Sequence, residues 1–163
     1  MKAFLGLGSN TGDRLGNLRD AVRRLAAAGN IDILSTSPVY ETAPVGGPEQ
    51  PDYLNAAVGI AATHEASQLL GLCHDIEEGM GRVRTERWGP RVIDIDLLLY
   101  GNQVLKTPEL TVPHPLMHER AFVLKPLADI APDVVHPVLG LTVSEMLNRV
   151  GGSNEVKSAI GEL

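Results

Sequence analysis

Residues 92–100 read VIDIDLLLY, and this stretch predicts a β-strand with two different faces. Because side chains alternate along a strand, Asp94 and Asp96 fall on one face, about 6.6 Å apart along the chain, and the aliphatic residues around them fall on the other. Two carboxylates at this spacing can share one Mg²⁺ ion or bracket two ions about 3.5–4 Å apart. The alternative is a half-exposed strand whose aspartates meet only water.

Just before this strand, four arginines surround the only tryptophan, at positions 82, 84, 87, 91 and 88. A guanidinium group can bind two phosphate oxygens at once. Trp88 followed by Gly89-Pro90 suggests a loop with a defined closed shape. Aspartate is disfavoured in strands, so two aspartates beside such a loop favour a metal. Together the two features predict transfer of a phosphoryl group from a Mg²⁺-bound nucleotide. The alternative is a solvated loop whose arginines pair with Glu77, Glu78 and Glu86.

Outward from this region, apolar periodicity predicts alternating strands and helices. Strands are expected at 2–7, 31–37 and 53–63, and helices at 13–28, 65–78, 120–130 and 142–150. The prolines at 108, 113 and 115 mark an extended segment. The connections are too short for repeated β-α-β crossovers, which favours an antiparallel or mixed sheet. The predicted fold is α+β, with a ferredoxin-like core of mostly antiparallel sheet covered by helices in a three-layer α/β/α sandwich, and one domain over 1–163.

Composition excludes several classes of protein. The net charge is −6 and the sequence pI is about 5.3, which argues against a nonspecific nucleic-acid binder. Cys73 is the only cysteine, so an intramolecular disulfide and a thiolate zinc cluster are excluded and a reducing compartment is indicated. No apolar run approaches the ~18 residues that a membrane-spanning helix needs. We therefore expect a cytoplasmic protein without a membrane segment and without an obligate protein partner.

Six ordered motifs make the chain resemble a known family. They are Gly8-Ser9-Asn10, Gln50-Pro51-Asp52-Tyr53-Leu54-Asn55-Ala56, Gly81-Arg82-Val83-Arg84, Arg87-Trp88-Gly89-Pro90-Arg91, Asp94-Ile95-Asp96 and Val112-Pro113-His114-Pro115. Over about residues 3 to 137 the chain resembles 6-hydroxymethyl-7,8-dihydropterin pyrophosphokinase of folate biosynthesis. The resemblance implies transfer of the β,γ-pyrophosphoryl group of ATP to the hydroxymethyl oxygen of the pterin, with release of AMP and with two Mg²⁺ ions.

The resemblance also implies roles on the phosphate side of the site. Asp94 and Asp96 would be the metal ligands, and Arg82 and Arg91 would stabilise charge on the transferring group. The positions that match the ATP-binding residues of the family are His74, Glu77, Arg84, Trp88, His114 and Arg120.

On the pterin side, the resemblance implies that the ring stacks between Tyr53 and Phe122 while Asn55 reads its polar edge. Backbone or wall contacts would come from Thr42, Ala43 and Val45.

Two rival functions remain open at the level of the sequence. An RNA-binding module could use a ferredoxin-like sheet with arginines and aromatic residues, but the acidic net charge and the absence of an RNP-type aromatic pattern oppose it. A Mg²⁺-dependent phosphohydrolase could use the same arginines and aspartates with water as the nucleophile. Whether AMP forms only when a hydroxymethylpterin is present distinguishes the hydrolase from the pyrophosphokinase.

Overall fold

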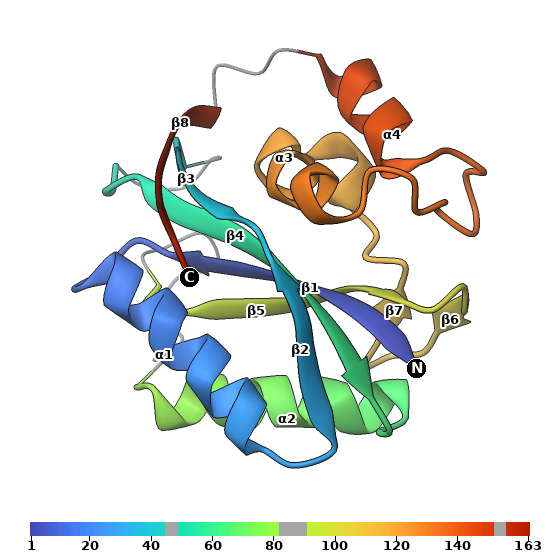
Figure 1. Cartoon of the computed structure of the whole chain (residues 1–163), viewed down its shortest axis with the longest axis horizontal. Helices are drawn as coiled ribbons and strands as arrows, with labels where there is room; N and C mark the ends of the chain where they lie inside the picture. The colour runs from blue at the N-terminus through green and yellow to red at the C-terminus, as the bar shows by residue number, and fades with distance from the viewer. Residues whose placement is uncertain (45–48, 82–90, 152–155) are drawn as a thin grey trace.

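The computed structural model describes residues 1–44, 49–81, 91–151 and 156–163. Within them, one sheet has the order β5 (Asp94–Tyr100), β1 (Lys2–Ser9), β4 (Tyr53–Ala62), β3 (Pro38–Thr42) and β8 (Val156–Glu162), and β2 (Ile31–Thr36) pairs with the other end of β4 (Figure 1). Every pairing in this sheet is antiparallel. The predicted extended segment contains a short hairpin, β6 (Leu105–Lys106) and β7 (Thr111–Val112).

Helices cover both faces of the sheet. On one face lie α1 (Arg14–Ala27) and α2 (Ala66–Gly79), and on the other lie the 3₁₀ turn η1 (Met117–Glu119), α3 (Ala121–Ile130) and α4 (Val143–Val150) (Figure 1). This is the predicted ferredoxin-like α+β arrangement in three layers. The helices fall within a residue or two of the predicted ranges, including α3 in spite of Pro126. Within the described residues, no helix combines the length and apolarity needed to cross a membrane.

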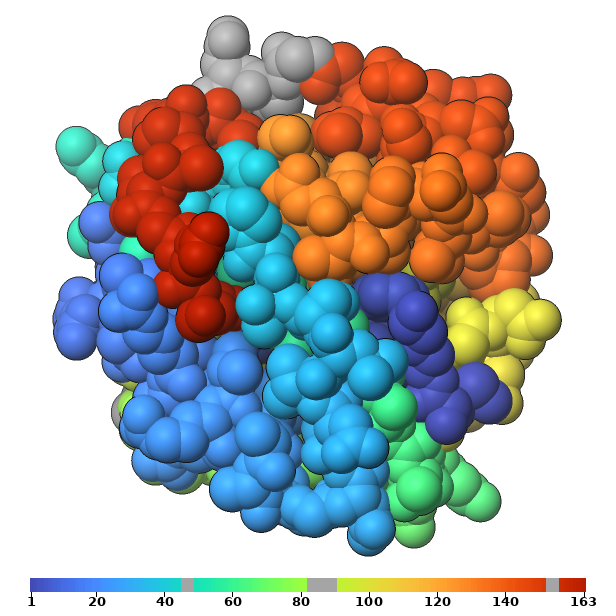
Figure 2. All heavy atoms as spheres, viewed as in Figure 1, coloured from blue at the N-terminus to red at the C-terminus, as the bar shows by residue number. Residues whose placement is uncertain are grey.

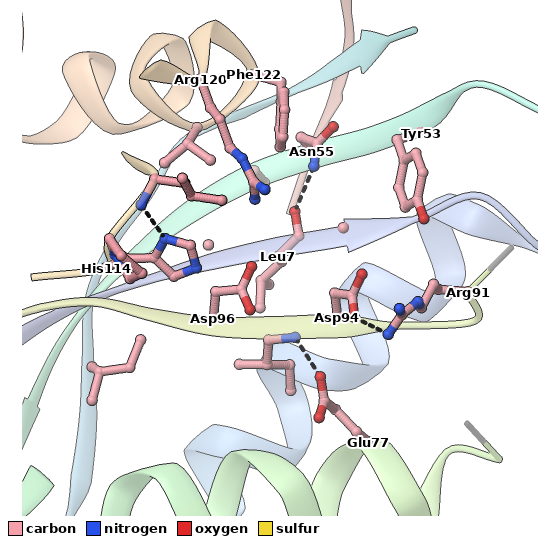
Figure 3. A pocket seen from close by; sticks show the side chains of 18 of the residues that line it. Leu7, Tyr53, Asn55, Glu77, Arg91, Asp94, Asp96, His114, Arg120 and Phe122 are labelled. Carbon is pink, nitrogen blue, oxygen red and sulfur yellow. Dashed lines mark hydrogen bonds and ion pairs between the residues drawn. The ribbon is translucent and has the colours of Figure 1, made fainter. Parts of the chain in front are cut away.

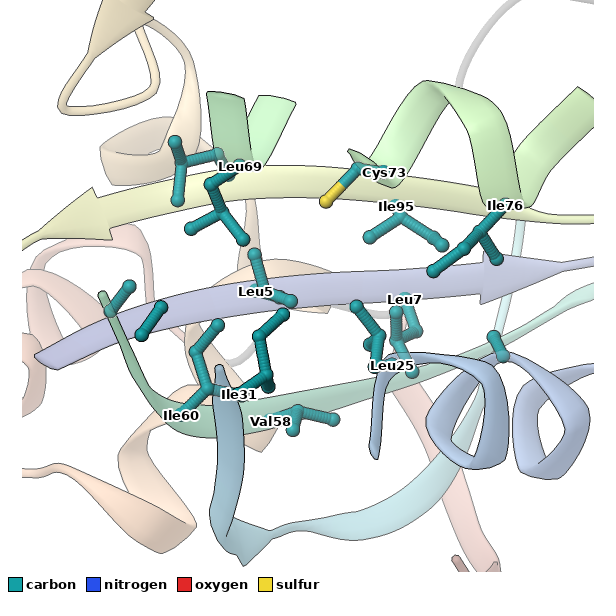
Figure 4. Close-up of a cluster of buried hydrophobic side chains, with 14 of the residues drawn as sticks. Leu5, Leu7, Leu25, Ile31, Val58, Ile60, Leu69, Cys73, Ile76 and Ile95 are labelled. Carbon is teal, nitrogen blue, oxygen red and sulfur yellow. The ribbon is translucent and has the colours of Figure 1, made fainter. Parts of the chain in front are cut away.

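The larger core lies between the sheet and the α1–α2 layer. Alternate residues of the central strands point into it, and apolar residues of both helices meet them at helical spacing. Its members include Leu5, Leu7, Val58, Ile60 and Ile95 from the sheet and Leu25, Leu69, Cys73 and Ile76 from the helices (Figure 4). This face of the sheet is mostly apolar, and the opposite side chains of the same strands build a different surface.

The second core, under α3 and α4, covers only part of that opposite surface. Phe4, Ala57 and Leu98 of the sheet pack against Leu124 and Leu127 of α3. The α4 helix begins with a capping box in which the Thr142 hydroxyl accepts a hydrogen bond from the Glu145 amide, and the Glu145 carboxylate accepts one from the Thr142 amide. The rest of this face, toward Gly8 and Asp94, is open to a cavity.

Two strands of the main sheet were absent from the prediction. The residues after 37 form β3, because the Ser37 hydroxyl accepts a hydrogen bond from the Ala57 amide at the bend and lets the chain continue along β4. The C-terminal residues form β8, which pairs with β3; in Figure 2 these dark red residues lie beside the cyan ones of β3. The predicted antiparallel sheet is therefore wider than the sequence pattern indicates.

Candidate active site

A cavity of about 560 Å³ lies between the sheet and the start of α3 (Figure 3). Its floor is formed by β1, where Leu5 and Leu7 point into the larger core and Gly6 and Gly8 face the cavity. Because these glycines carry no side chain, a ligand can lie against bare backbone. The side chains around the floor include Tyr53 and Asn55 of β4, Asp94 and Asp96 of β5, and Arg120 and Phe122 at the start of α3.

Asp94 and Asp96 lie on the cavity face of β5, as the alternation predicts. They pair in register with Gly8 and Gly6, so both carboxylates stand beside the bare floor. Ile95, between them, is buried in the opposite core. The Arg91 guanidinium is 3.5 Å from the Asp94 carboxylate, which brings one predicted phosphate-binding arginine to the predicted metal-binding strand.

The two aspartates suit a Mg²⁺ ion that arrives with its substrate. Among the described residues, no group of three or more His, Cys, Asp or Glu side chains is arranged to hold a metal. Mg²⁺ in phosphoryl-transfer sites is commonly bound by one or two carboxylates, with phosphate oxygens and water completing the octahedron. The donor set therefore fits a nucleotide-bound Mg²⁺ better than a resident metal held by protein groups alone.

Glu77 is buried on α2, below the two aspartates. It is 3% exposed, and its carboxylate accepts a hydrogen bond of 2.9 Å from the Ile95 amide. Ile95 lies on the edge strand of the sheet, so Glu77 satisfies a backbone donor between Asp94 and Asp96. This position gives Glu77 a role in holding the strand, in addition to the predicted contact with the nucleotide. His74, one turn earlier, is exposed and also lines the cavity.

Cys73, one helical turn before Glu77, is buried and unreactive. Burial, and then the nearby carboxylates of Glu77 and Asp96, raise the pKa of the Cys73 thiol to about 12. The thiol is therefore neutral at physiological pH, and Cys73 is a core residue, as its position on the apolar stripe of the helix predicts.

His114 and Arg120, from the segment between β7 and α3, line another wall of the cavity. Burial, and then the Arg120 charge, lower the pKa of His114 to about 4, so its ring is neutral at physiological pH. The His114 Nδ1 accepts a hydrogen bond of 3.2 Å from the Leu116 amide, which leaves the ring proton on Nε2 as a donor. The Arg120 guanidinium lies over the Phe122 ring, 5.5 Å from its centroid. A phosphate-binding candidate and a pterin-stacking candidate are thus in direct contact.

The predicted pterin residues come together around Asn55. Figure 3 shows the Tyr53 and Phe122 rings beside Asn55, which is 9% exposed. The Thr42 hydroxyl donates a hydrogen bond to the Asn55 Oδ1, and the Asn55 Nδ2 donates one of 3.4 Å to the Leu7 carbonyl. These bonds hold the amide in one orientation. Ala43 also lines the cavity.

Four predicted site residues cannot be compared with this geometry. Val45, Arg82, Arg84 and Trp88 lie outside the described residues. The remaining predicted site residues all line the one cavity.

Asn10 is a residue to which the sequence pattern assigned no role. It is 1% exposed, and its Nδ2 donates to the Gln50 side chain at 2.8 Å and to the Pro51 carbonyl at 3.1 Å. Its Oδ1 accepts from the Arg91 amide at 2.8 Å. Asn10 therefore ties the segment that leads to Tyr53 to the segment that carries Arg91. The signal in the sequence was a polar residue directly after a buried strand, in a motif already noted for the family resemblance.

The chain is similar to known proteins over most of its length. Residues 4–132 match the family model of 7,8-dihydro-6-hydroxymethylpterin-pyrophosphokinase. The chain is 47% identical to the 2-amino-4-hydroxy-6-hydroxymethyldihydropteridine pyrophosphokinase of Methylorubrum extorquens, over 93% of this chain and 95% of the relative. It is 46% identical to the protein of the same name from Bacillus subtilis, over 81% of this chain and 79% of the relative.

A solved structure shares the fold. The crystal structure of wild-type HPPK-DHPS from Plasmodium falciparum with pteroate superposes with a TM-score of 0.73 at 17% identity, and the match covers 91% of this chain and 42% of that one. At this identity the likeness concerns the fold alone, and the chain spans less than half of that longer protein. The family model and the near full-length relatives go further: this chain belongs to the 7,8-dihydro-6-hydroxymethylpterin-pyrophosphokinase family.

Proposed function

We propose that this protein transfers pyrophosphate from ATP to the hydroxymethyl group of 6-hydroxymethyl-7,8-dihydropterin, giving the pterin diphosphate and AMP, in folate biosynthesis. The relatives that align over most of their length carry the name of this activity. The observation in the structure that supports it best is one cavity in which an oriented amide, Asn55, and two aromatic rings face the same space as the carboxylates of Asp94 and Asp96.

The pterin side of the cavity suits a flat, polar-edged ring. Tyr53 and Phe122 supply two aromatic faces, and the glycine floor leaves room for a planar ring. Asn55 presents an amide whose orientation is already fixed by Thr42 and the Leu7 carbonyl, so little side-chain freedom is lost on binding. This side of the site would set which hydroxymethyl compound is accepted.

The phosphate side suits a triphosphate. Arg91 and Arg120 would bind phosphate oxygens, and the neutral His114 ring would donate from Nε2. In the reaction, the hydroxymethyl oxygen loses its proton and forms a bond to the β-phosphorus of ATP. The bond from that phosphorus to the oxygen bridging the α- and β-phosphates breaks, which releases AMP. The arginines would stabilise the charge that develops on the transferring group.

Asp94 and Asp96 would hold Mg²⁺ with the nucleotide, and two ions are proposed. When bound, the metal would neutralise phosphate charge and orient the transferring group. Of the chain's own groups, Glu77 would keep the backbone between the two carboxylates fixed, and the Arg91 charge next to Asp94 would place a cation where carboxylate and phosphate meet.

The test is the dependence of AMP formation on the pterin. Purified protein is incubated with ATP and Mg²⁺, with and without 6-hydroxymethyl-7,8-dihydropterin, and the nucleotides and pterins are separated by chromatography. We expect AMP and pterin diphosphate in equal amounts, and only with the pterin present. AMP formed at the same rate without the pterin would instead indicate a phosphohydrolase. The RNA-binding alternative is tested by a separate filter-binding assay, in which retention of a polynucleotide by the protein would support it.

Dependence on Mg²⁺ is tested separately. Activity should fall after chelation and return with added Mg²⁺. Calorimetry with a non-hydrolysable ATP analogue gives a second readout. The parent should bind the analogue more weakly without Mg²⁺, whereas binding to Asp94→Asn or Asp96→Asn should depend much less on Mg²⁺. Equal analogue binding with and without the metal in the parent would contradict the metal assignment.

A further inference from the structure

The C-terminal strand β8 contains an irregularity at one lysine. Along β3, Glu41 pairs with Ser158 and the next residue, Thr42, pairs with Val156, so Lys157 is an extra residue between them. Such a bulge bends the strand and changes the direction in which the extra side chain points. Lys157 points to the segment that leads into β4, where its Nζ is 2.6 Å from the Asp52 carboxylate.

Asp52 is also held from the other side. The Arg14 guanidinium at the start of α1 donates a hydrogen bond of 2.9 Å to the Asp52 carbonyl, and the same nitrogen is 3.1 Å from the Glu41 carboxylate on β3. Arg14, Glu41, Asp52 and Lys157 therefore form one charged cluster, which we name the Asp52 anchor. It joins α1, β3, β8 and the residue directly before Tyr53.

The contact with Asp52 stabilises the charged form of Lys157. The hydrogen bond that the Lys157 ammonium donates to the Asp52 carboxylate is the main effect that raises the pKa of Lys157. Desolvation opposes it, and the Asp52 and Glu41 charges add to the increase. The lysine is thus fully charged at neutral pH. Both side chains are partly exposed, so the pair contributes little to global stability.

The position of the anchor suggests what it does. Tyr53 is the first residue of β4 and lines the pterin side of the cavity, and its backbone direction is set by the residue before it. On the inner side, Asn10 holds Gln50 and the Pro51 carbonyl, and on the outer side the anchor holds Asp52. Ordering this segment before the ligand arrives lowers the entropy cost of binding.

We propose that Lys157 and Asp52 are positioning residues, and that β8 uses its bulge to hold the segment before Tyr53 in the orientation that binds the pterin. This inference rests on the proposed function, because it assigns the aromatic wall to pterin binding. It gives the C-terminal strand a part in substrate affinity although no residue of β8 lines the cavity.

The test separates the KM for the pterin from the KM for ATP. Lys157→Met and Asp52→Asn should each raise the pterin KM about three-fold, the size expected for losing one partly exposed ion pair, with the ATP KM and the melting temperature unchanged. The double variant should be no worse than either single variant, because both remove the same contact. Lys157→Arg keeps the charge and should keep the parent KM.

Arg23→Met is the matched control. It removes an exposed cation that pairs with Asp20 on α1, outside the cavity, and should change neither KM. Amide hydrogen exchange of residues 49–53 adds a readout independent of catalysis: exchange should be faster in Lys157→Met and Asp52→Asn but not in Arg23→Met.

Two results would overturn the inference. One is a pterin KM that rises no more than the ATP KM, and the other is unchanged exchange of residues 49–53 in both variants. Either result leaves the proposed function standing, because that function is tested on the parent protein by pterin-dependent release of AMP. Failure of the parent in that assay would instead overturn the proposed function, whatever the exchange data show about the anchor.

Discussion

Replacing Asn10 by alanine should weaken both halves of the site at once. The side chain makes three hydrogen bonds of 2.8–3.1 Å with other segments, to the Gln50 side chain, to the Pro51 carbonyl and from the Arg91 amide, and accepts a longer one of 3.4 Å from the neighbouring Thr11 hydroxyl. Asn10 is 1% exposed, so water cannot easily replace these bonds. At about 1 kcal/mol for each of the three bonds with other segments, the free energy of unfolding should fall by about 3 kcal/mol. For a domain of this size, this loss corresponds to a melting temperature lower by about 6–12 °C.

Calorimetry and steady-state kinetics check this prediction together. Both the ATP KM and the pterin KM should rise in Asn10→Ala, because Asn10 joins the segments on either side. Asn17→Ala is the control: its side chain donates to the Ser9 hydroxyl and the Thr11 carbonyl in the same turn but reaches neither segment, so it should lower stability less and leave both KM values near the parent. A melting temperature within about 2 °C of the parent in Asn10→Ala would refute the reasoning.

Three further predictions follow from the geometry of the cavity. Asp94→Asn and Asp96→Asn should each reduce turnover by at least about a hundred-fold with an unchanged melting temperature, since the buried face of β5 is untouched; near-normal turnover at millimolar Mg²⁺ would contradict the metal role. Gly8→Ala should raise the pterin KM more than the ATP KM, because the new Cβ would stand 2.9 Å from the Asn55 Nδ2 and force that amide to move; equal changes in both KM values would count against it. The pKa of His114 is lowered in the folded protein, so unfolding takes up a proton between about pH 4 and 6.5. The free energy of unfolding should therefore decrease, by up to about 3 kcal/mol, as the pH is lowered from about 6.5 to about 4. His114→Asn should reduce that pH dependence in denaturant titrations, and an unchanged slope would argue against a buried neutral ring.

The parts of the fold that were predicted correctly have strong local patterns. The α1 and α2 helices carry apolar residues at helical spacing, and β5 alternates between aspartate and aliphatic side chains. β8 was missed because most of its residues are exposed and its sequence has no alternation; its strand conformation depends on pairing with β3, more than a hundred residues earlier. Propensity and pattern carry no information about such a long-range partner.

The site shows the same division. The two aspartates were predicted to share a face because alternation along one strand decides it. The part that Asn10 plays could not be predicted, because the partners that let it join two segments lie 40 to 81 residues away in the chain. Glu77 did leave a local signal: it follows Cys73 by one helical turn, and a carboxylate on an apolar stripe needs a buried partner, which proved to be the Ile95 amide.

The bare floor formed by Gly6 and Gly8 also bears on inhibitors of this protein. A flat compound that lies on this floor contacts backbone, which mutation cannot alter without adding a side chain. An added Cβ at Gly8 would collide with Asn55, and one at Gly6 would stand 3.4 Å from the Leu98 side chain. A side chain at Gly8 that excluded such a compound from the floor would thus also disturb Asn55, which is proposed to hold the natural substrate. Resistance should therefore arise first at the walls of the cavity, and compounds that draw most of their contact area from the floor should retain their potency for longer.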